Sequence, residues 1–155
     1  MKVFIDTNII LEYFMHREEY ATSERLLMEL RQNGIQMFMS VGAFYTILYV
    51  VLKYLRKEQE LVGEECIRNL RAVMQQILLL FDVAEHDKES LLRGVSDQKY
   101  KDLEDSCQCK VAQKVGCDFL LSFNTSDYHV EEHSSIRVLT PQQFLERIPW
   151  GGKRK

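Results

Sequence analysis

Short apolar runs alternate with longer helix-like segments along this chain, and that alternation constrains the fold most. A short apolar run that is bounded by polar or turn residues is typical of a buried strand. The five runs that we expect to form strands span residues 3–5, 36–39, 77–81, 117–122 and 136–139. Segments with helical periodicity stand between them, and parallel strands need such crossover helices. The order therefore predicts an α/β fold, with a central parallel sheet of four or five strands and helices on both faces.

Two of these segments carry specific expectations. Val41 to Leu55 is apolar nearly all round, which predicts a helix at the centre of the molecule. Residues 77–81, Ile-Leu-Leu-Leu-Phe, read as a third strand buried on both faces. Gly116 should end the helix that begins near Asp102, because glycine tolerates the left-handed conformation that closes many helices.

Length and charge limit the classes of function. The 155 residues suffice for one domain with a sizeable core, which we expect over residues 1–150, followed by a basic tail at 151–155. The net charge of −3 gives no bulk signature of nucleic-acid binding, so any such site must be a local patch. Lys53, Arg56 and Lys57 are candidate RNA contacts, with Arg68 and Arg71 as further candidates.

The cysteines and the apolar segments indicate the compartment. No two of the four cysteines form a Cys-x-x-Cys pair, which argues against zinc and for reduced, buried thiols. Asp6 interrupts the apolar N-terminus too early for a signal peptide. The apolar stretch at 41–52 is shorter than the about 20 residues that cross a bilayer. We therefore expect a cytoplasmic protein without a membrane partner.

Acidic residues gather where several of these elements meet. The polar side chains in question are Asp6 after the first strand, Asp102, Glu104 and Asp105 at a helix start, and Asn124 and Asp127 after the fourth strand. Ligands of open α/β sheets bind at the carboxyl ends of the strands. A helix that runs antiparallel to the strands begins at that same edge. Crowded carboxylates repel each other unless a cation is present. Oxygen ligands with few histidines suit Mg²⁺ or Mn²⁺.

Each of these residues also has a purely structural interpretation. Asp6 or its neighbours Thr7 and Asn8 could simply cap the following helix. We expect Asp102 to be the cap of its helix and Asp105 to face the site. Glu104 should point to solvent, and Asn124 and Asp127 could be ordinary turn residues.

Three segments, at residues 4–8, 102–108 and 120–128, give the chain a recognisable pattern: Phe-Ile-Asp-Thr-Asn, Asp-Leu-Glu-Asp-Ser-Cys-Gln and Leu-Leu-Ser-Phe-Asn-Thr-Ser-Asp-Tyr. In this order and spacing the chain resembles a PIN domain, a family of metal-dependent ribonucleases. The resemblance implies a three-layer, Rossmann-like sheet. Many PIN domains are the toxin half of bacterial toxin–antitoxin pairs, and others process or degrade RNA.

The resemblance also implies roles for single residues. Asp6, Asp105 and Asp127 match the catalytic acids, and these three with Asn124 match the metal-binding set. Asp102 is a possible secondary acid. The polar neighbours that would orient the acids and the substrate are Thr7, Asn8 and Ser122.

One departure from the family pattern concerns the helix after the second strand. PIN domains usually carry a glutamate there, but Ser40 to Tyr54 contains no carboxylate, and Tyr45 and Thr46 occupy that region. The chain thus lacks one usual anionic ligand.

The expected activity is endoribonuclease hydrolysis of phosphodiester bonds in single-stranded or structured RNA, with Mg²⁺ or Mn²⁺ as cofactor. The expected partners are RNA, an antitoxin protein and a second copy of the chain. A catalytically impaired PIN domain that binds RNA or protein is the alternative. A phosphatase with Asp6 as nucleophile is less favoured, because Asn8 stands where such enzymes usually carry a second aspartate.

Overall fold

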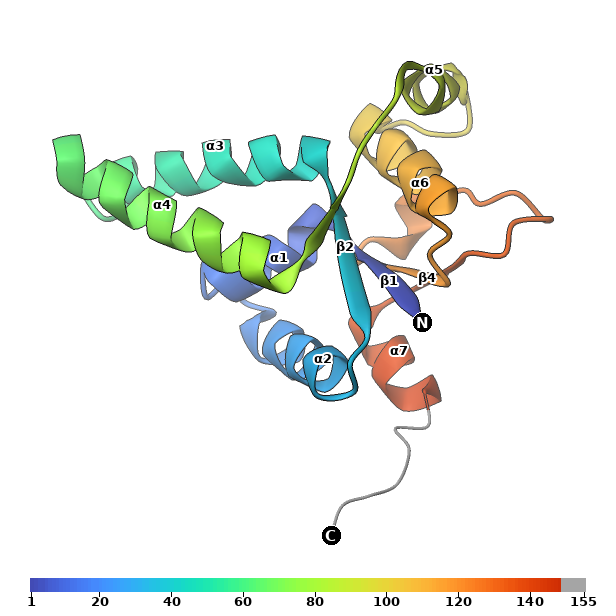
Figure 1. Ribbon diagram of the computed structural model, residues 1–155, viewed down its shortest axis with the longest axis horizontal. Coiled ribbons are helices and arrows are strands. Elements are labelled where there is room, and N and C mark those ends of the chain that lie inside the picture. Colours follow the sequence, from blue (N-terminus) through green and yellow to red (C-terminus); the bar gives the residue numbers. More distant parts are fainter. Residues whose placement is uncertain (149–155) are drawn as a thin grey trace, which may run out of the picture.

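The computed structural model describes residues 1–148, which fold around one five-stranded parallel sheet (Figure 1). The strands are β1 (Lys2–Ile5), β2 (Gln36–Ser40), β3 (Asp82–Ala84), β4 (Phe119–Leu121) and β5 (Arg137–Leu139), in the spatial order β3-β2-β1-β4-β5. The helices are α1 (Thr7–Phe14), α2 (Tyr20–Gln32), α3 (Val41–Lys57), α4 (Gly63–Leu80), α5 (Lys88–Ser96), α6 (Leu103–Val115) and α7 (Pro141–Arg147), with a 3₁₀ turn at Thr125–Asp127. The basic tail expected at 151–155 lies outside the described residues.

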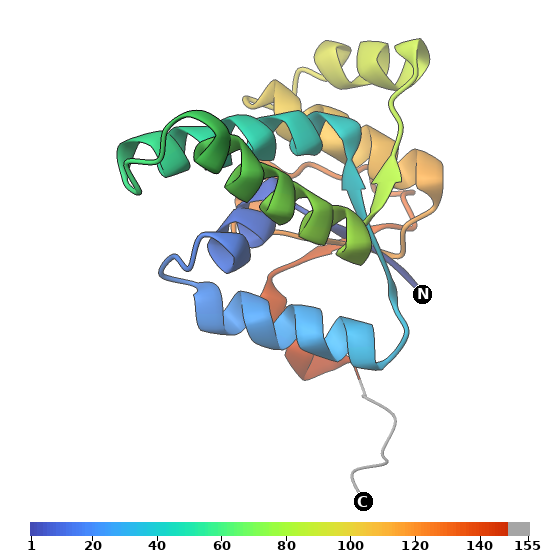
Figure 2. The same ribbon diagram turned by 60° about the vertical axis from the view of Figure 1, so that its left-hand side comes forward.

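Helices cover both faces of the sheet, as the alternation predicts. Val3 and Ile5 of β1 pack with α1, α2, α3, α4 and α7 on one face, while Phe4 packs with α6 on the other. Helix α5 lies on the outer side of α6 (Figures 1 and 2). The predicted three-layer α/β fold is confirmed.

The third strand is not where the sequence suggested. Residues 77–80 are the last turn of α4, and β3 begins only at Asp82. Cys66, Leu70, Met74 and Ile77 form the buried stripe of α4, so Ile77 belongs to a helical repeat that starts far upstream. Leu78 and Leu79 do not share that burial, since they are 48% and 85% exposed. The predicted strand at 77–81 was therefore wrong.

Helix α3 is also less central than its composition suggested. Its buried face consists of Ala43, Ile47, Val51 and Leu55, whereas Tyr45 and Tyr49 face solvent. The hairpin of α3 and α4 projects from the body of the molecule (Figure 2). Only one side of α3 can pack in such a hairpin.

The carboxyl edge of the sheet brings distant segments together. Ile5, the last residue of β1, pairs with Leu121, the last residue of β4. Asp6 and Ser122 consequently follow two adjacent strands at the same level. Helix α6 begins at this edge after Asp102 and ends at Gly116, whose φ of 75° is left-handed as expected.

No helix within residues 1–148 combines the length and the apolar character needed to cross a membrane. The four cysteines are free thiols, and Cys66, Cys109 and Cys117 are buried.

Candidate active site

Asp6 occupies the N-cap position of α1, yet its side chain makes no capping hydrogen bond. The residue is only 4% exposed, and its carboxylate instead accepts hydrogen bonds from Ser122 Oγ at 2.6 Å and Gln108 Nε2 at 3.5 Å. Burial raises the pKa of Asp6, and the hydrogen bond from Ser122 opposes that rise. A buried acid that leaves the cap unused is typical of a ligand-binding role.

The hydroxyl of Ser122 fixes the position of Asp6. It donates to Asp6 and accepts from Asn8 Nδ2 at 3.1 Å and from the backbone N–H of Asn124 at 3.0 Å. A hydroxyl has one donor and two acceptor sites, so all of its capacity is used. The structure thus brings Asn8 and Ser122 together beside Asp6.

The start of α6 presents Asp105 to the same place. Asp102 is the cap, and it accepts from the backbone N–H groups of Glu104 at 2.8 Å and Asp105 at 3.3 Å. Tyr128 donates its hydroxyl to Asp105 at 3.3 Å. Burial, followed by the charges of Asp6 and Asp102, raises the pKa of Asp105 to about 7. Near neutral pH this carboxyl group therefore exchanges a proton readily.

Glu104 is exposed, as the sequence suggested, but its carboxylate is not free in solvent. Its carboxylate accepts hydrogen bonds from Thr7 Oγ1 and Thr46 Oγ1, each at 3.3 Å. Burial, with Asp102 and Asp6 nearby, raises the pKa of Glu104. The two threonine contacts could not be foreseen, because they come from α1 and α3, which are distant in sequence.

These side chains line one cavity of about 260 Å³ at the carboxyl edge of the sheet. The lining residues are Asp6, Thr7, Asn8, Leu11, Arg17, Thr46, Asp102, Glu104, Asp105, Gln108, Asn124 and Asp127. Asn124 and Asp127 are exposed at its rim, in the turn after β4. Every predicted acid thus borders the cavity.

Sequence reasoning missed Arg17, Gln108 and Tyr128 at this site. Gln108 lies three residues after Asp105, a helical spacing that places both on one face of α6, so a signal for it existed. Arg17 follows α1 in an irregular connection, and nothing in its sequence context indicated that it reaches the acids.

The donor set suits a hard divalent cation. The cavity offers carboxylate oxygens from Asp6, Asp105 and Asp127 and an amide oxygen from Asn124. The amide oxygen Oε1 of Gln108 is buried without a hydrogen-bond partner. Within residues 1–148, however, no three Asp, Glu, His or Cys side chains already stand close enough to hold one ion. A cation would have to draw the carboxylates together from their present partners.

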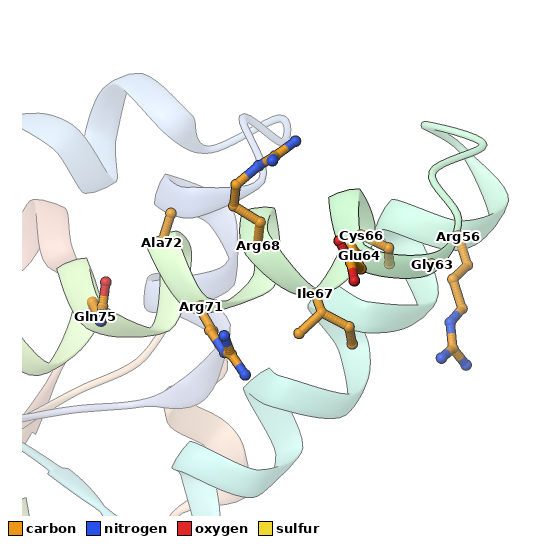
Figure 3. Close-up of a pocket in the computed structure, with 9 residues that line it drawn as sticks. All are labelled: Arg56, Gly63, Glu64, Cys66, Ile67, Arg68, Arg71, Ala72 and Gln75. Carbon is orange, nitrogen blue, oxygen red and sulfur yellow. The ribbon is translucent and has the colours of Figure 1, made fainter.

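The basic residues predicted to contact RNA lie along α3, away from the acids. Lys53, Arg56 and Lys57 border a small cavity with Tyr49, and Arg56 also borders a cavity of about 870 Å³ along α4. Figure 3 shows Arg56 and Arg71 extending to the same side of α4, with Arg68 on the opposite side. The larger cavity is thus basic and separate from the acid-lined one.

A parallel α/β sheet with clustered acids at its carboxyl edge defines a class of protein rather than an individual one. A family model described as PIN domain matches residues 2–126, and the chain belongs to this family. It is 31% identical over 149 residues to Ribonuclease VapC1 of Aquifex aeolicus (strain VF5), covering 94% of each chain.

The fold is also similar to a solved structure, the crystal structure of VapBC2 from Rickettsia felis bound to a DNA fragment from their promoter. The TM-score is 0.60 at 16% sequence identity, over 90% of this chain and 99% of that one. At that identity the likeness concerns the fold alone.

Proposed function

We propose that this protein is a metal-dependent endoribonuclease that hydrolyses phosphodiester bonds in RNA. The observation that carries the proposal is the convergence of Asp6, Asp105 and Asp127, with the amide of Asn124, on one cavity at the carboxyl edge of the sheet. The chain's membership of the PIN family and its relative named as a ribonuclease support the same reaction.

The proposed ligands of Mg²⁺ or Mn²⁺ are Asp6, Asp105, Asp127 and Asn124. When bound, the ion would lower the pKa of a coordinated water and polarise a phosphoryl oxygen. Ser122 holds the Asp6 carboxylate in one orientation, with Asn8 bonded to the same hydroxyl. Asp105, whose pKa is raised to about 7 without a cation, would bind the ion in its deprotonated form. Arg17, the basic side chain on the cavity wall, would bind the scissile phosphate.

The exposed face of α3 supplies a path for the RNA. Tyr45 and Tyr49 are 66% and 64% exposed, and Lys53 and Lys57 continue at the same four-residue spacing. Aromatic rings that stack bases, beside cations that follow the backbone, are typical of surfaces that bind single strands. The neighbouring Thr46 lines the acid cavity, so the path begins at the site. This arrangement favours single-stranded RNA over a duplex.

The test is a cleavage time course on single-stranded RNA with millimolar Mn²⁺ or Mg²⁺. Wild type should cleave, and Asp105→Asn and Asp6→Asn should lose at least about a hundredfold in rate, because each removes an anionic ligand. Glu146→Gln on the distant helix α7 is the matched control and should cleave as wild type does. Equal activity in wild type and Asp105→Asn would indicate a contaminating nuclease and overturn the proposal.

A catalytically impaired binding module is the second candidate. It is supported by the absence of any carboxylate between Ser40 and Tyr54 and by the lack of a preassembled cage within the described residues. Binding of RNA by wild type in fluorescence anisotropy, without metal-dependent cleavage in the time course, would favour this alternative.

We also propose an antitoxin protein as partner. Support comes from the toxin role of many PIN domains and from the VapC and VapBC proteins that the chain resembles. A homodimer is a further proposal, since Leu91, Leu92 and Val95 of α5 and Leu103 of α6 are each more than 40% exposed. Light scattering of the isolated protein would test it. The four free thiols support a cytoplasmic location.

A further inference from the structure

Glu104 is held over the acid cavity by two elements that are remote from its own. Thr7 belongs to α1 and Thr46 to α3, and each donates its hydroxyl to a different oxygen of the Glu104 carboxylate. Helix α3 contributes no carboxylate of its own near the cavity, but Thr46 anchors one that comes from α6. The result is an acid from α6 at the point where α1, α3 and α6 meet.

A simple helix-dipole role does not explain this placement. An acid in the first turn of a helix is favourable wherever it points. Glu89 of α5 provides the comparison, because it too follows an aspartate N-cap by two residues. Both glutamates are exposed, but Glu89 makes none of the side-chain hydrogen bonds found in the described residues, whereas Glu104 has two.

Gln108 gives an independent sign that the cavity takes a ligand. It lies one helical turn after Glu104, is 1% exposed and lines the same cavity. Its Nε2 donates to Asp6, while its Oε1 is buried without a partner. An unsatisfied buried acceptor is unfavourable, and a coordinated cation or its bound water would satisfy it.

The bonds that hold Glu104 are weak enough to be exchanged. Both are 3.3 Å long, beyond the 2.5–3.0 Å that is usual for a hydroxyl donor. The two threonines therefore orient the carboxylate and leave it free to turn toward a cation between it and Asp105.

We infer that Glu104 is a further acidic ligand of the divalent cation, positioned by the hydroxyls of Thr7 and Thr46. The inference rests on the proposed function and adds a residue to its site. Chemically, Glu104 supplies from α6 the anionic oxygen that α3 lacks. It brings the proposed carboxylate ligands of the cation to four, with Asp6, Asp105 and Asp127.

The experiment measures Mn²⁺ binding by isothermal titration calorimetry, without RNA. Glu104→Gln should weaken Mn²⁺ binding at least about tenfold, and Glu89→Gln should leave it unchanged. The double variant Thr46→Glu/Glu104→Gln should recover most of the lost affinity, because it returns a carboxylate to the same junction from the α3 side. Circular dichroism melting of each variant identifies any that fails to fold.

The outcomes separate this inference from the proposed function. Mn²⁺ binding by Glu104→Gln as tight as wild type, with binding lost in Asp105→Asn, would overturn the role of Glu104 alone. No binding by wild type at millimolar Mn²⁺ would overturn the metal-dependent function, and this inference with it. Loss in Glu104→Gln together with recovery in the double variant supports the inference.

Discussion

At the scale of single residues, Asp105 links the electrostatics of the site to the stability of the fold. Its pKa of about 7 lies far above the about 3.9 of an unfolded aspartate. The folded state therefore binds this proton more tightly than the unfolded state does. The resulting stability is full below about pH 4 and is lost as pH rises through 7.

Asp105→Asn removes that loss, because an amide stays neutral and can still accept from Tyr128. In metal-free buffer we expect the variant to melt a few degrees above wild type at pH 8, on the order of 1 kcal/mol, and at the same temperature near pH 4. Thermal melts across this range would check it. A variant that is less stable at pH 8 would show that Tyr128 needs the charged carboxylate.

The positions of some side chains in the site can be predicted from the amino-acid sequence, and those of others cannot. Asp6 was foreseeable, since it directly follows an apolar run and parallel strands end at one edge, and the resemblance to PIN domains implied Ser122. Glu104 was not, because its direction depends on threonines 97 and 58 residues away. The acids in the first turn of α6 identified Asp102 as the cap, but they carried no information on the contacts of Glu104.

At the scale of elements, α3 has two faces with different tasks. Its buried stripe packs against the core. On its outer face, Tyr45, Tyr49, Lys53 and Lys57 are exposed to solvent. Substitutions on the outer face should therefore change binding and leave folding intact.

We expect Tyr45→Ala/Tyr49→Ala to weaken binding of single-stranded RNA by at least about tenfold, since each stacked base contributes about 1–3 kcal/mol. Fluorescence anisotropy with a labelled oligonucleotide in metal-free buffer would measure it. Leu79→Ala, an exposed apolar change on α4, is the control and should bind normally. Unchanged RNA affinity combined with a change in oligomeric state would mean that this face joins two copies of the chain.

Elements were easier to place than to classify. The helix α6 was foreseeable from the acidic cap at its start and from Gly116 at its end. The run at 77–81 was not, because five apolar residues fit a strand and a buried helix turn equally well. Only the upstream stripe ending at Ile77 decides between them.

At the scale of the whole molecule, the cavity couples cation binding to global stability. A ligand that binds only the folded state raises the free energy of unfolding, by about 1.4 kcal/mol when its concentration is ten times its Kd. The melting temperature rises with it. We expect Mn²⁺ to stabilise wild type and not Asp6→Asn. Without metal, Asp6→Asn should melt at or above the wild-type temperature, because burial raises the pKa of Asp6 and so disfavours its charge.

Differential scanning fluorimetry with and without Mn²⁺ would measure both effects. A large loss of stability in metal-free Asp6→Asn would mean that the hydrogen bond with Ser122 matters more to the fold than the relief of charge.

The pairing of β1 with β4 has a consequence for synthesis on the ribosome. Asp6 leaves the ribosome more than a hundred residues before its partner Ser122 and the rim residues Asn124 and Asp127. A nascent chain that has emerged only as far as α5 contains Asp6 but none of the other acids of the cavity. The messenger being translated is therefore not exposed to an assembled acid site until β4 and the turn after it have been made.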